Sequence, residues 1–545
     1  MNTNSYTLSG NIVDLRVETI FKGRVHVKDG KIAQVEKDET VKENHYILPG
    51  LVDAHIHIES SMLIPSEFAR LASVHGTVAT VSDPHEIANV LGIEGINYMI
   101  DNGGKVPFKF YFGASSCVPA TPFETAGFEI GVEQLDNLLA KDEIKYMSEM
   151  MNFPGVINRD EGVMQKLEVA KKYGKPIDGH APGVKGEDAR KYIEAGISTD
   201  HECFTMDEAL EKINYGMKIQ IREGSAAKNF DALIDLMQDY PEEVLFCSDD
   251  KHPDDLVEGH INQLVIRAIN KGYDPLKVLK SAIINPIDHY GLDVGTLQTG
   301  DPADMIVVND LTNFQVLATY VNGILIAENG KTLLPSVKEM MPNNFHAQPV
   351  TTEDVRVVPQ KTKLKVIEAL DGQLITNIIY ADFKVKDGNV VSDPENDILK
   401  IVVLNRYNKA KPAVAFIKNF GLKRGAIASS VAHDSHNIVA VGVDDEKIVR
   451  AINLIVEEKG GVALAEGMEE MILPLPVAGL MSAEDGYKIA EEYHKIDKKA
   501  HELGSKLRAP FMTLSFMALL VIPDLKLSDK GLFDGRKFSF TELFS

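Results

Sequence analysis

The chain has 545 residues, of which 44% are hydrophobic and 25% charged, and its formal net charge is −23 at pH 7. The length predicts two to four domains of an ordinary globular protein. The negative charge argues against a nucleic-acid backbone or an anionic membrane as the main partner. Residues 1–10 lack the pattern of a signal peptide, and Cys117, Cys203 and Cys247 form no CxxC pair. A cytoplasmic protein without a disulfide framework is therefore expected.

The pattern of strands and helices changes along the chain. Residues 5–48 alternate apolar and polar positions, which is typical of a small antiparallel sheet. From about residue 47 to 292, a strand, a polar loop and an amphipathic helix recur about eight times, which predicts a (β/α)₈ barrel. The predicted strands cover residues 47–57, 77–82, 108–113, 144–150, 176–179, 197–199, 218–222 and 244–247.

The sequence pattern of strands and turns returns at residues 295–308, so a sheet that begins at the N-terminus is expected to be completed there. The predicted fold class is α/β, with three domains. These are a two-part β-sandwich (1–48 plus 293–345), the barrel (49–292) and an additional C-terminal α+β domain (355–545). Residues 336–362 are polar and contain prolines, as linkers do. The longest apolar run, 509–527, is broken by prolines, which favours a buried segment over a membrane span.

The most informative stretch is 49–57, in which an apolar run ends in His55 and His57. Residues i and i+2 of a strand point to the same face, so both imidazoles could bind one divalent metal. An HxH pair alone is weak evidence, because paired histidines often lie on solvated strand edges. Its weight comes from similar residues at later strand ends.

Reactive residues of a (β/α)₈ barrel lie at the C-terminal ends of its strands. Imidazoles and carboxylates of the kind that bind Zn, Mn and Fe occur there repeatedly. They are Asp83, His85 and Glu86 after strand two, Glu149 at strand four, His180 after strand five, His201 after strand six, and Asp249, Asp250 and His252 after strand eight. A set of four imidazoles and two carboxylates drawn from such a rim suits two divalent cations. Cations held in this way lower the pKa of bound water to about 7 and supply a hydroxide nucleophile.

Each of these residues also has a simpler interpretation. His180 or His201 alone is more often a hydrogen-bonded structural histidine than a ligand. Glu149 could pair with a lysine, and Asp249 could cap the following helix. The Asp83–Glu86 cluster precedes an amphipathic helix and is equally a good helix start. Their joint occurrence at strand ends favours the metal site.

Two stretches resemble the amidohydrolase superfamily: 49–57 is similar to its first metal motif, and 295–308 to its return to a flanking β-sandwich. Within that superfamily, further stretches resemble the adenine deaminases of the bacterial type. They are residues 81–90, 247–256, 431–437, 479–482 and 514–519. The resemblance spans nearly the whole chain.

This resemblance implies two metal ions per chain, Mn²⁺ or Fe²⁺ with Zn²⁺ as the alternative. The implied ligands are His55, His57, Glu149, His180, His201 and Asp249. It also implies hydrolysis of adenine to hypoxanthine and ammonia in purine metabolism, with Asp249 as proton shuttle and Glu149 as metal bridge. The expected partner is a small purine base, and a homo-oligomer is expected.

The residues around the purine are less sharply defined. Asp83, His85 and Glu86 are assigned to the ring or to an additional cation, and Asp250 or His252 to N7 or the leaving amine. His433 and His436 are expected to reach over the barrel mouth. The alternative for the 433–437 motif is a polar turn that satisfies its own backbone.

Two other functions compete with deamination. Hydrolysis of a cyclic amide, such as a dihydropyrimidine or hydantoin, would proceed without release of ammonia. A non-enzymatic scaffold would typically lack the ligands, and all six are present here. The preference for adenine over adenosine or guanine comes from the resemblance.

Overall fold

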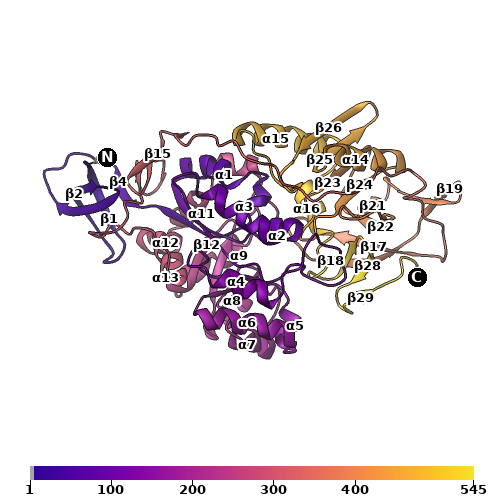
Figure 1. Cartoon of the computed structure of the whole chain (residues 1–545), viewed down its shortest axis with the longest axis horizontal. Helices are drawn as coiled ribbons and strands as arrows, with labels where there is room; N and C mark the ends of the chain where they lie inside the picture. The colour runs from indigo at the N-terminus through magenta and orange to yellow at the C-terminus, as the bar shows by residue number, and fades with distance from the viewer. Residues whose placement is uncertain (1–4) are drawn as a thin grey trace.

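The computed structural model describes residues 5–545 as an elongated molecule with a small sheet at one end, a helix-covered centre and a larger C-terminal region at the other end (Figure 1). Mixed α and β content and a separate C-terminal region agree with the predicted fold class. In the described part of the chain, none of the helices has the length and hydropathy needed to cross a bilayer.

The sheet at the N-terminal end joins two distant parts of the chain. Its order is β16-β15-β14-β13-β4-β1-β2-β3, and β13 pairs antiparallel with β4 through Met305 and Pro49. Ile12, Val25 and Ile47 bury side chains in its core. The strands are β1 (Ser5–Asp14), β2 (Thr19–Lys28), β3 (Lys31–Lys37), β4 (Tyr46–Pro49), β13 (Met305–Val308), β14 (Val316–Val321), β15 (Ile324–Glu328) and β16 (Lys331–Thr332).

The centre contains parallel strands whose neighbours follow chain order, in the sheets β5-β6-β7, β8-β9 and β10-β11-β12. The strands are β5 (Leu51–Ile56), β6 (Thr77–Ser82), β7 (Lys109–Phe112), β8 (Met147–Met150), β9 (Ile177–Gly179), β10 (Thr199–Asp200), β11 (Lys218–Arg222) and β12 (Val244–Cys247). Asp249 after β12 donates its backbone N–H to the carbonyl of His55 in β5 (2.9 Å). The carboxyl ends of the strands therefore meet on one side.

The expected strand 47–57 is wrong in one respect, because it is two strands that belong to different sheets. The break falls at Gly50, where a Cβ would lie 2.2 Å from Cγ1 of Val78. Only a glycine lets the backbone pass this close, so β4 ends in the flanking sheet and β5 begins in the centre.

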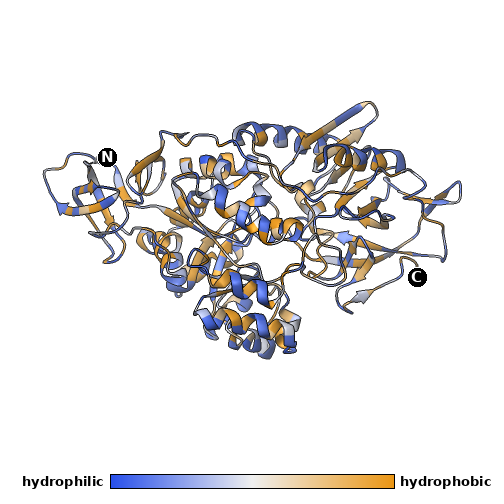
Figure 2. Ribbon diagram, viewed as in Figure 1, coloured by the Kyte–Doolittle hydropathy of each residue, from blue (hydrophilic) through white to orange (hydrophobic). Residues whose placement is uncertain are grey.

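Helices alternate with these strands and turn their apolar faces inward (Figure 2). In α6, Asp160 accepts a hydrogen bond from the backbone N–H of Val163 at the N-terminus, and Gly174 ends the helix at φ 63°. The helices are α1 (Pro65–Ala72), α2 (His85–Leu91), α3 (Ile93–Gly103), α4 (Val132–Leu139), α5 (Phe153–Ile157), α6 (Glu161–Tyr173), α7 (Gly186–Glu194), α8 (Met206–Asn214), α9 (Phe230–Leu233), α10 (Pro253–Glu258), α11 (Ile261–Asn270), α12 (Pro275–Ala282) and α13 (Ile284–Tyr290).

The C-terminal region is built on a second eight-stranded sheet of order β18-β17-β22-β21-β24-β23-β25-β26, with β19-β20 and β27-β28-β29 beside it. Residues 333–363, which precede it, form neither helix nor strand. Its strands are β17 (Leu364–Ala369), β18 (Thr376–Ala381), β19 (Lys384–Lys386), β20 (Asn389–Val391), β21 (Ile398–Leu404), β22 (Ala413–Lys418), β23 (Ala426–Ser429), β24 (Ile438–Gly442), β25 (Gly461–Glu466), β26 (Glu469–Pro474), β27 (Leu525–Ser528), β28 (Gly531–Asp534) and β29 (Ser539–Phe540). Its helices are α14 (Asp445–Glu458), α15 (Gly486–Glu502) and α16 (Pro510–Phe516).

The C-terminal region packs against the carboxyl-end side of the central strands. Arg70 of α1 contacts Asp485, at the start of α15, with 2.8 Å between Nη1 and Oδ2. The backbone N–H of Ser482 donates to the carbonyl of Met62 (2.8 Å). These contacts place loops of the C-terminal region over the strand ends that carry the predicted site.

Candidate metal and substrate site

A cavity lies between the strand ends and the C-terminal region. Its inner side is lined mainly by polar residues, namely His57, His85, Glu86, Glu149, Met151, His180, His201, Glu202, Asp249 and Asp250. Its outer side is lined by Leu374, His433, Asp434, Phe516 and Leu519. Polar groups and apolar side chains thus meet at one cavity.

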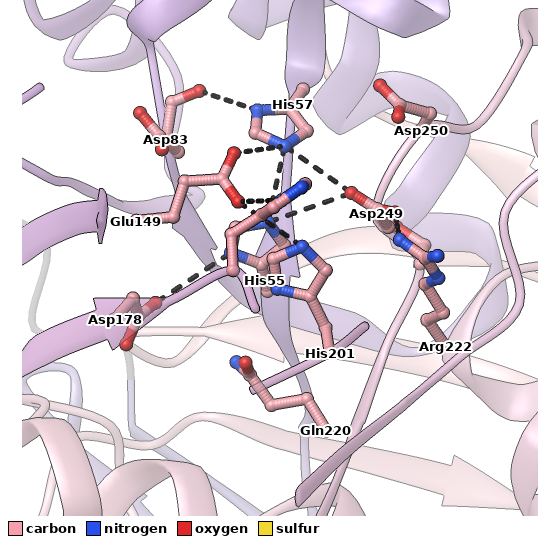
Figure 3. Close-up of polar contacts among 12 residues, drawn as sticks. His55, His57, Asp83, Glu149, Asp178, His201, Gln220, Arg222, Asp249 and Asp250 are labelled. Atoms are coloured by element: carbon pink, nitrogen blue, oxygen red, sulfur yellow. Dashed lines mark hydrogen bonds and ion pairs between the residues drawn. The ribbon is translucent and has the colours of Figure 1, made fainter. Parts of the chain in front are cut away.

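His55, in β5, and His57, directly after it, form the bottom of the cluster. Their rings converge, and their Nε2 atoms lie 3.2 Å apart (Figure 3). Oδ1 of Asp249 lies 3.3 Å from Nε2 of His57 and 3.7 Å from Nε2 of His55. The i, i+2 geometry of a strand therefore gives the convergence that the sequence predicted.

Glu149, at the end of β8, occupies the middle of the cluster. Its Oε1 lies 3.5 Å from Nε2 of His57 and 3.5 Å from Nδ1 of His85. Its Oε2 lies 2.8 Å from Nδ1 of His180 and 3.3 Å from Nε2 of His201. The two oxygens of one carboxylate thus face two different groups of imidazoles.

Asp249 is held by groups that the sequence analysis did not select. Nη1 of Arg222, at the end of β11, donates to its Oδ2 (2.6 Å), which leaves Oδ1 toward His55 and His57. The same guanidinium bonds Glu202, whose Oε1 lies 3.5 Å from Nε2 of His201. Asp249 itself has φ 55°, a left-handed conformation that Asp tolerates better than most residues.

The chemistry of these donors fits divalent metal ions. The clusters His55–His57–Asp249 and His55–Glu149–His201 each bring three ligand atoms within 4.8 Å of one another, and all of these residues are buried. Nε2 of His180 has no hydrogen-bond partner in the described structure. Buried imidazoles and carboxylates without other partners are the ligands that Zn, Mn and Fe accept.

A second layer of residues supports the imidazoles. Oδ2 of Asp178 lies 3.7 Å from Nδ1 of His55, and its Oδ1 accepts hydrogen bonds from Thr199 (2.9 Å) and Tyr290 (2.8 Å). The backbone carbonyl of Asp83 lies 3.3 Å from Nδ1 of His57. A backbone carbonyl beside Nδ1, as His57 has, fixes the tautomer and the orientation of an imidazole, whereas Asp178 is an ionic neighbour of His55 beyond hydrogen-bond distance.

Charge pairing keeps the central carboxylates ionised. Burial by itself raises the pKa of a carboxyl. Nevertheless, His180 and His201 hold the pKa of Glu149 well below its usual range. Arg222, together with His57 and His201, likewise holds the pKa of Asp249 well below its usual range. Both groups are therefore acceptors in the neutral pH range.

A second cluster joins the centre to the C-terminal region. Glu86, in the first turn of α2, pairs through one oxygen with Nδ1 of His433 and through the other with Nε2 of His436. Nδ1 of His85 lies 3.0 Å from Oδ2 of Asp83, and its Nε2 lies 3.7 Å from Oδ1 of Asp434. The structure thus brings the Asp83–Glu86 cluster and the 433–437 motif together at the cavity.

The remaining predicted residues separate. Asp250 lines the cavity and accepts a hydrogen bond from the hydroxyl of Ser60 (2.5 Å). His252 is turned away, with its Nδ1 2.7 Å from the hydroxyl of Tyr493. His436 lies behind Glu86 and accepts the backbone N–H of Ala432. Neither His252 nor His436 is among the residues that line the cavity.

Sequence reasoning missed Arg222, Glu202 and Asp434. Arg222 ends the seventh central strand, so the strand-end rule itself pointed to it. Glu202 follows His201 directly, and Asp434 lies within the 433–437 motif. These three lacked a metal-ligand pattern of their own, which is why only their neighbours were selected.

Comparison with known proteins adds independent information. Residues 46–326 match the amidohydrolase family, and residues 373–539 match the adenine deaminase C-terminal domain. The chain is 55% identical to an adenine deaminase of Salinibacter ruber over 99% of both chains. It is 54% identical to one of Methanosarcina mazei, over 98% of this chain and 99% of the other. It is 46% identical to one of Borreliella burgdorferi, again over 98% and 99%. The resemblance inferred from the motifs is confirmed, and the chain belongs to the adenine deaminase family of amidohydrolases.

Proposed function

We propose that this chain catalyses the hydrolytic deamination of adenine, in which adenine and water give hypoxanthine and ammonia. The main support is the buried set of four imidazoles and two carboxylates at one cavity, in a chain that matches adenine deaminases over nearly its full length. The reaction needs a nucleophilic hydroxide at C6, a proton carrier and a site for a flat base. The cavity offers residues suited to each.

We further propose that the eight parallel strands form a closed (β/α)₈ barrel. Support comes from the parallel pairings and from the bond between Asp249 after β12 and His55 of β5. The proposed domains remain 1–48 plus 293–345, 49–292 and 355–545. The joint sheet of β4 and β13 is consistent with the first of them.

The proposed metal ligands are His55, His57, Glu149, His180, His201 and Asp249, with Glu149 as the bridge. When bound, two divalent ions such as Mn²⁺ or Fe²⁺ supply a hydroxide nucleophile at neutral pH. The contacts of Glu149 support its role, because Oε1 faces His57 and Oε2 faces His180. Arg222 holds Asp249 and also bonds Glu202, which lies 3.5 Å from His201.

Asp249 is proposed to carry the proton. It takes the proton of the attacking nucleophile and delivers it to the exocyclic nitrogen, which leaves as ammonia. Oδ2 is held by Arg222, so Oδ1, which faces His55 and His57, is the atom left both to hold a metal and to take up the proton. Its left-handed backbone supports a residue selected for function, since such conformations cluster at active sites.

The base is proposed to lie between the proposed metal ligands and the residues of the C-terminal region that line the cavity. The proposed contacts to ring nitrogens or the amine come from His85, Glu86 and Asp250, which line the cavity. Asp83 does not line it and would act through His85, 3.0 Å away. His433 is proposed to close the pocket from the C-terminal side. The ring of His433 stacks on that of Phe516, with centroids 4.4 Å apart at 11°. His252 and His436 would act indirectly, through Tyr493 and Glu86.

The test is a panel of adenine, adenosine, guanine, a dihydropyrimidine and a hydantoin, assayed for ammonia with the chain reconstituted separately with Mn²⁺, Fe²⁺ and Zn²⁺. Ammonia from adenine, in equal amount to hypoxanthine, is the expected result. Turnover of a cyclic amide without ammonia would replace the proposal with the amidase alternative. Adenosine turnover exceeding that of adenine would move the substrate to nucleosides.

A further inference from the structure

One buried lysine of the C-terminal region touches the wall of the cavity from outside. The side chain of Lys526, in β27, is completely buried. Its ammonium donates hydrogen bonds to the backbone carbonyls of Leu374 (2.7 Å) and Phe516 (2.9 Å). Both of these residues line the outer side of the cavity.

Ordinary charge pairing does not account for this lysine. The carboxylate that acts on it is Asp524. That carboxylate already accepts a hydrogen bond from Nε of Arg536 (2.5 Å). Burying an ammonium without a dedicated partner is costly, so the position calls for a role that an apolar side chain could not fill.

The ammonium bonds one carbonyl at a helix end and one in a turn. Phe516 is the last residue of α16, and its carbonyl accepts the backbone N–H of Leu519 (3.3 Å) as well as the shorter bond from Lys526 (2.9 Å). A cation there satisfies a carbonyl and favours the negative end of the helix. Leu374 lies in the turn before β18, and Thr376, two residues on, donates its hydroxyl to Leu525 (2.9 Å). One ammonium therefore joins two separate segments to β27.

Through Phe516 the contact reaches the polar part of the site. The Phe516 ring stacks on His433, and His433 pairs with Glu86. Leu374 also lines a neighbouring cavity together with Glu202 and Arg222, so its side chain separates that cavity from the proposed substrate cavity. The position of both wall residues is set by backbone that Lys526 holds.

We propose that Lys526 is a positioning residue that fixes the outer wall of the purine pocket, by tying the backbones of Leu374 and Phe516 to one point. It touches neither substrate nor metal ligands. This inference rests on the proposed function, because the wall matters only if a base binds against it.

The test compares Lys526→Met with Lys400→Met. Lys400 is an equally buried lysine of the C-terminal sheet, whose ammonium bonds Asp445 (2.6 Å) and the carbonyl of Val355 (3.0 Å), away from the cavity. Both variants should lose thermal stability. Only Lys526→Met should raise KM for adenine and the inhibition constant of hypoxanthine, each by about tenfold, because a displaced wall loses apolar contact with the bound substrate and with the bound product alike. Its kcat should change far less, and metal content should not change.

Three results would overturn the proposal. The first is an unchanged KM in Lys526→Met, assayed where circular dichroism shows it folded. The second is an equal rise of KM in Lys400→Met. The third is failure of both Lys526→Met and Lys526→Gln to fold while Lys400→Met folds, which would make the role purely structural. An unmodified chain that releases no ammonia from adenine would contradict the proposed function instead, so the two failures are distinguishable.

Discussion

The two sides of the cavity are built differently. The floor consists of imidazoles and carboxylates at the ends of β-strands, where neighbouring backbones hold each side chain, as β5 and the residue after it hold His55 and His57. The outer wall comes from loops and a short helix of the C-terminal region, represented by Leu374, His433 and Phe516. Metal ligands need fixed geometry, whereas a wall needs shape and exclusion of water. Changes to the floor should therefore affect metal content and kcat, and changes to the wall should affect KM.

The sharpest test of the floor is His201→Ala. Removing one proposed ligand should empty at least one metal position and reduce turnover by at least about 10³-fold, because a bound cation contributes several kcal/mol to catalysis. Elemental analysis of the reconstituted chain measures the loss. An unchanged metal content, or less than one metal per chain in the unmodified protein, would contradict the two-metal floor.

Asp249→Asn separates ligand from proton carrier within the floor. The substitution keeps the size, one oxygen acceptor and a residue tolerant of the left-handed backbone, but it removes the charge that accepts a proton. Turnover should fall by about 10²- to 10⁴-fold, the usual worth of a general base, while much of the metal stays bound. Steady-state kinetics with parallel metal analysis decide the matter. Near-normal turnover would assign the proton transfer to Glu149, since His252 does not line the cavity.

The double variant His433→Ala, His436→Ala probes the wall. It removes two of the imidazoles that pair with Glu86, leaving His85, and it removes the stacking partner of Phe516. KM for adenine should rise about tenfold or more, which is what losing a charge-assisted hydrogen bond costs. Metal content should stay at the unmodified level. Wild-type kinetics would reduce the motif to a structural turn.

The contact between α10 and α15, where wall and floor regions dock, should respond to pH. Burial, together with Asp255 and Asp497, raises the pKa of Asp254 from 3.8 to about 6, and His494 lies 3.6 Å away. A raised carboxyl pKa gives stability that is complete below about pH 4 and lost as pH rises through about 6.

Asp254→Asn removes that loss. Its melting temperature should therefore exceed that of the unmodified chain at pH 7.5, by an amount worth about 1 kcal/mol, and the gain should shrink at pH 4.5. Calorimetry at the two pH values measures the difference. Asp231→Asn, at an exposed carboxylate paired with Arg267 and Lys271, is the control and should show no such gain. An equal gain at both pH values would rule out the titration of Asp254.

Much of the floor could be predicted because its information is local. Strands β11 and β12 occupy the predicted residues, and the histidines and carboxylates follow strand ends that periodicity reveals. The break at Gly50 could not be predicted, since it depends on the side chain of Val78 from another strand. His252 shows the same limit, because an apparently matched motif residue is turned toward Tyr493.

The sequence by itself determined the family, the strand ends and the kinds of ligand, because strand periodicity and motif spacing are written in neighbouring residues. Tertiary structure alone decided which residues meet across the cavity. The pairing of Glu86 with His433 and the contact of Lys526 with Leu374 join positions that are remote along the chain. Such contacts depend on how two separately packed regions dock, and no local pattern encodes that geometry.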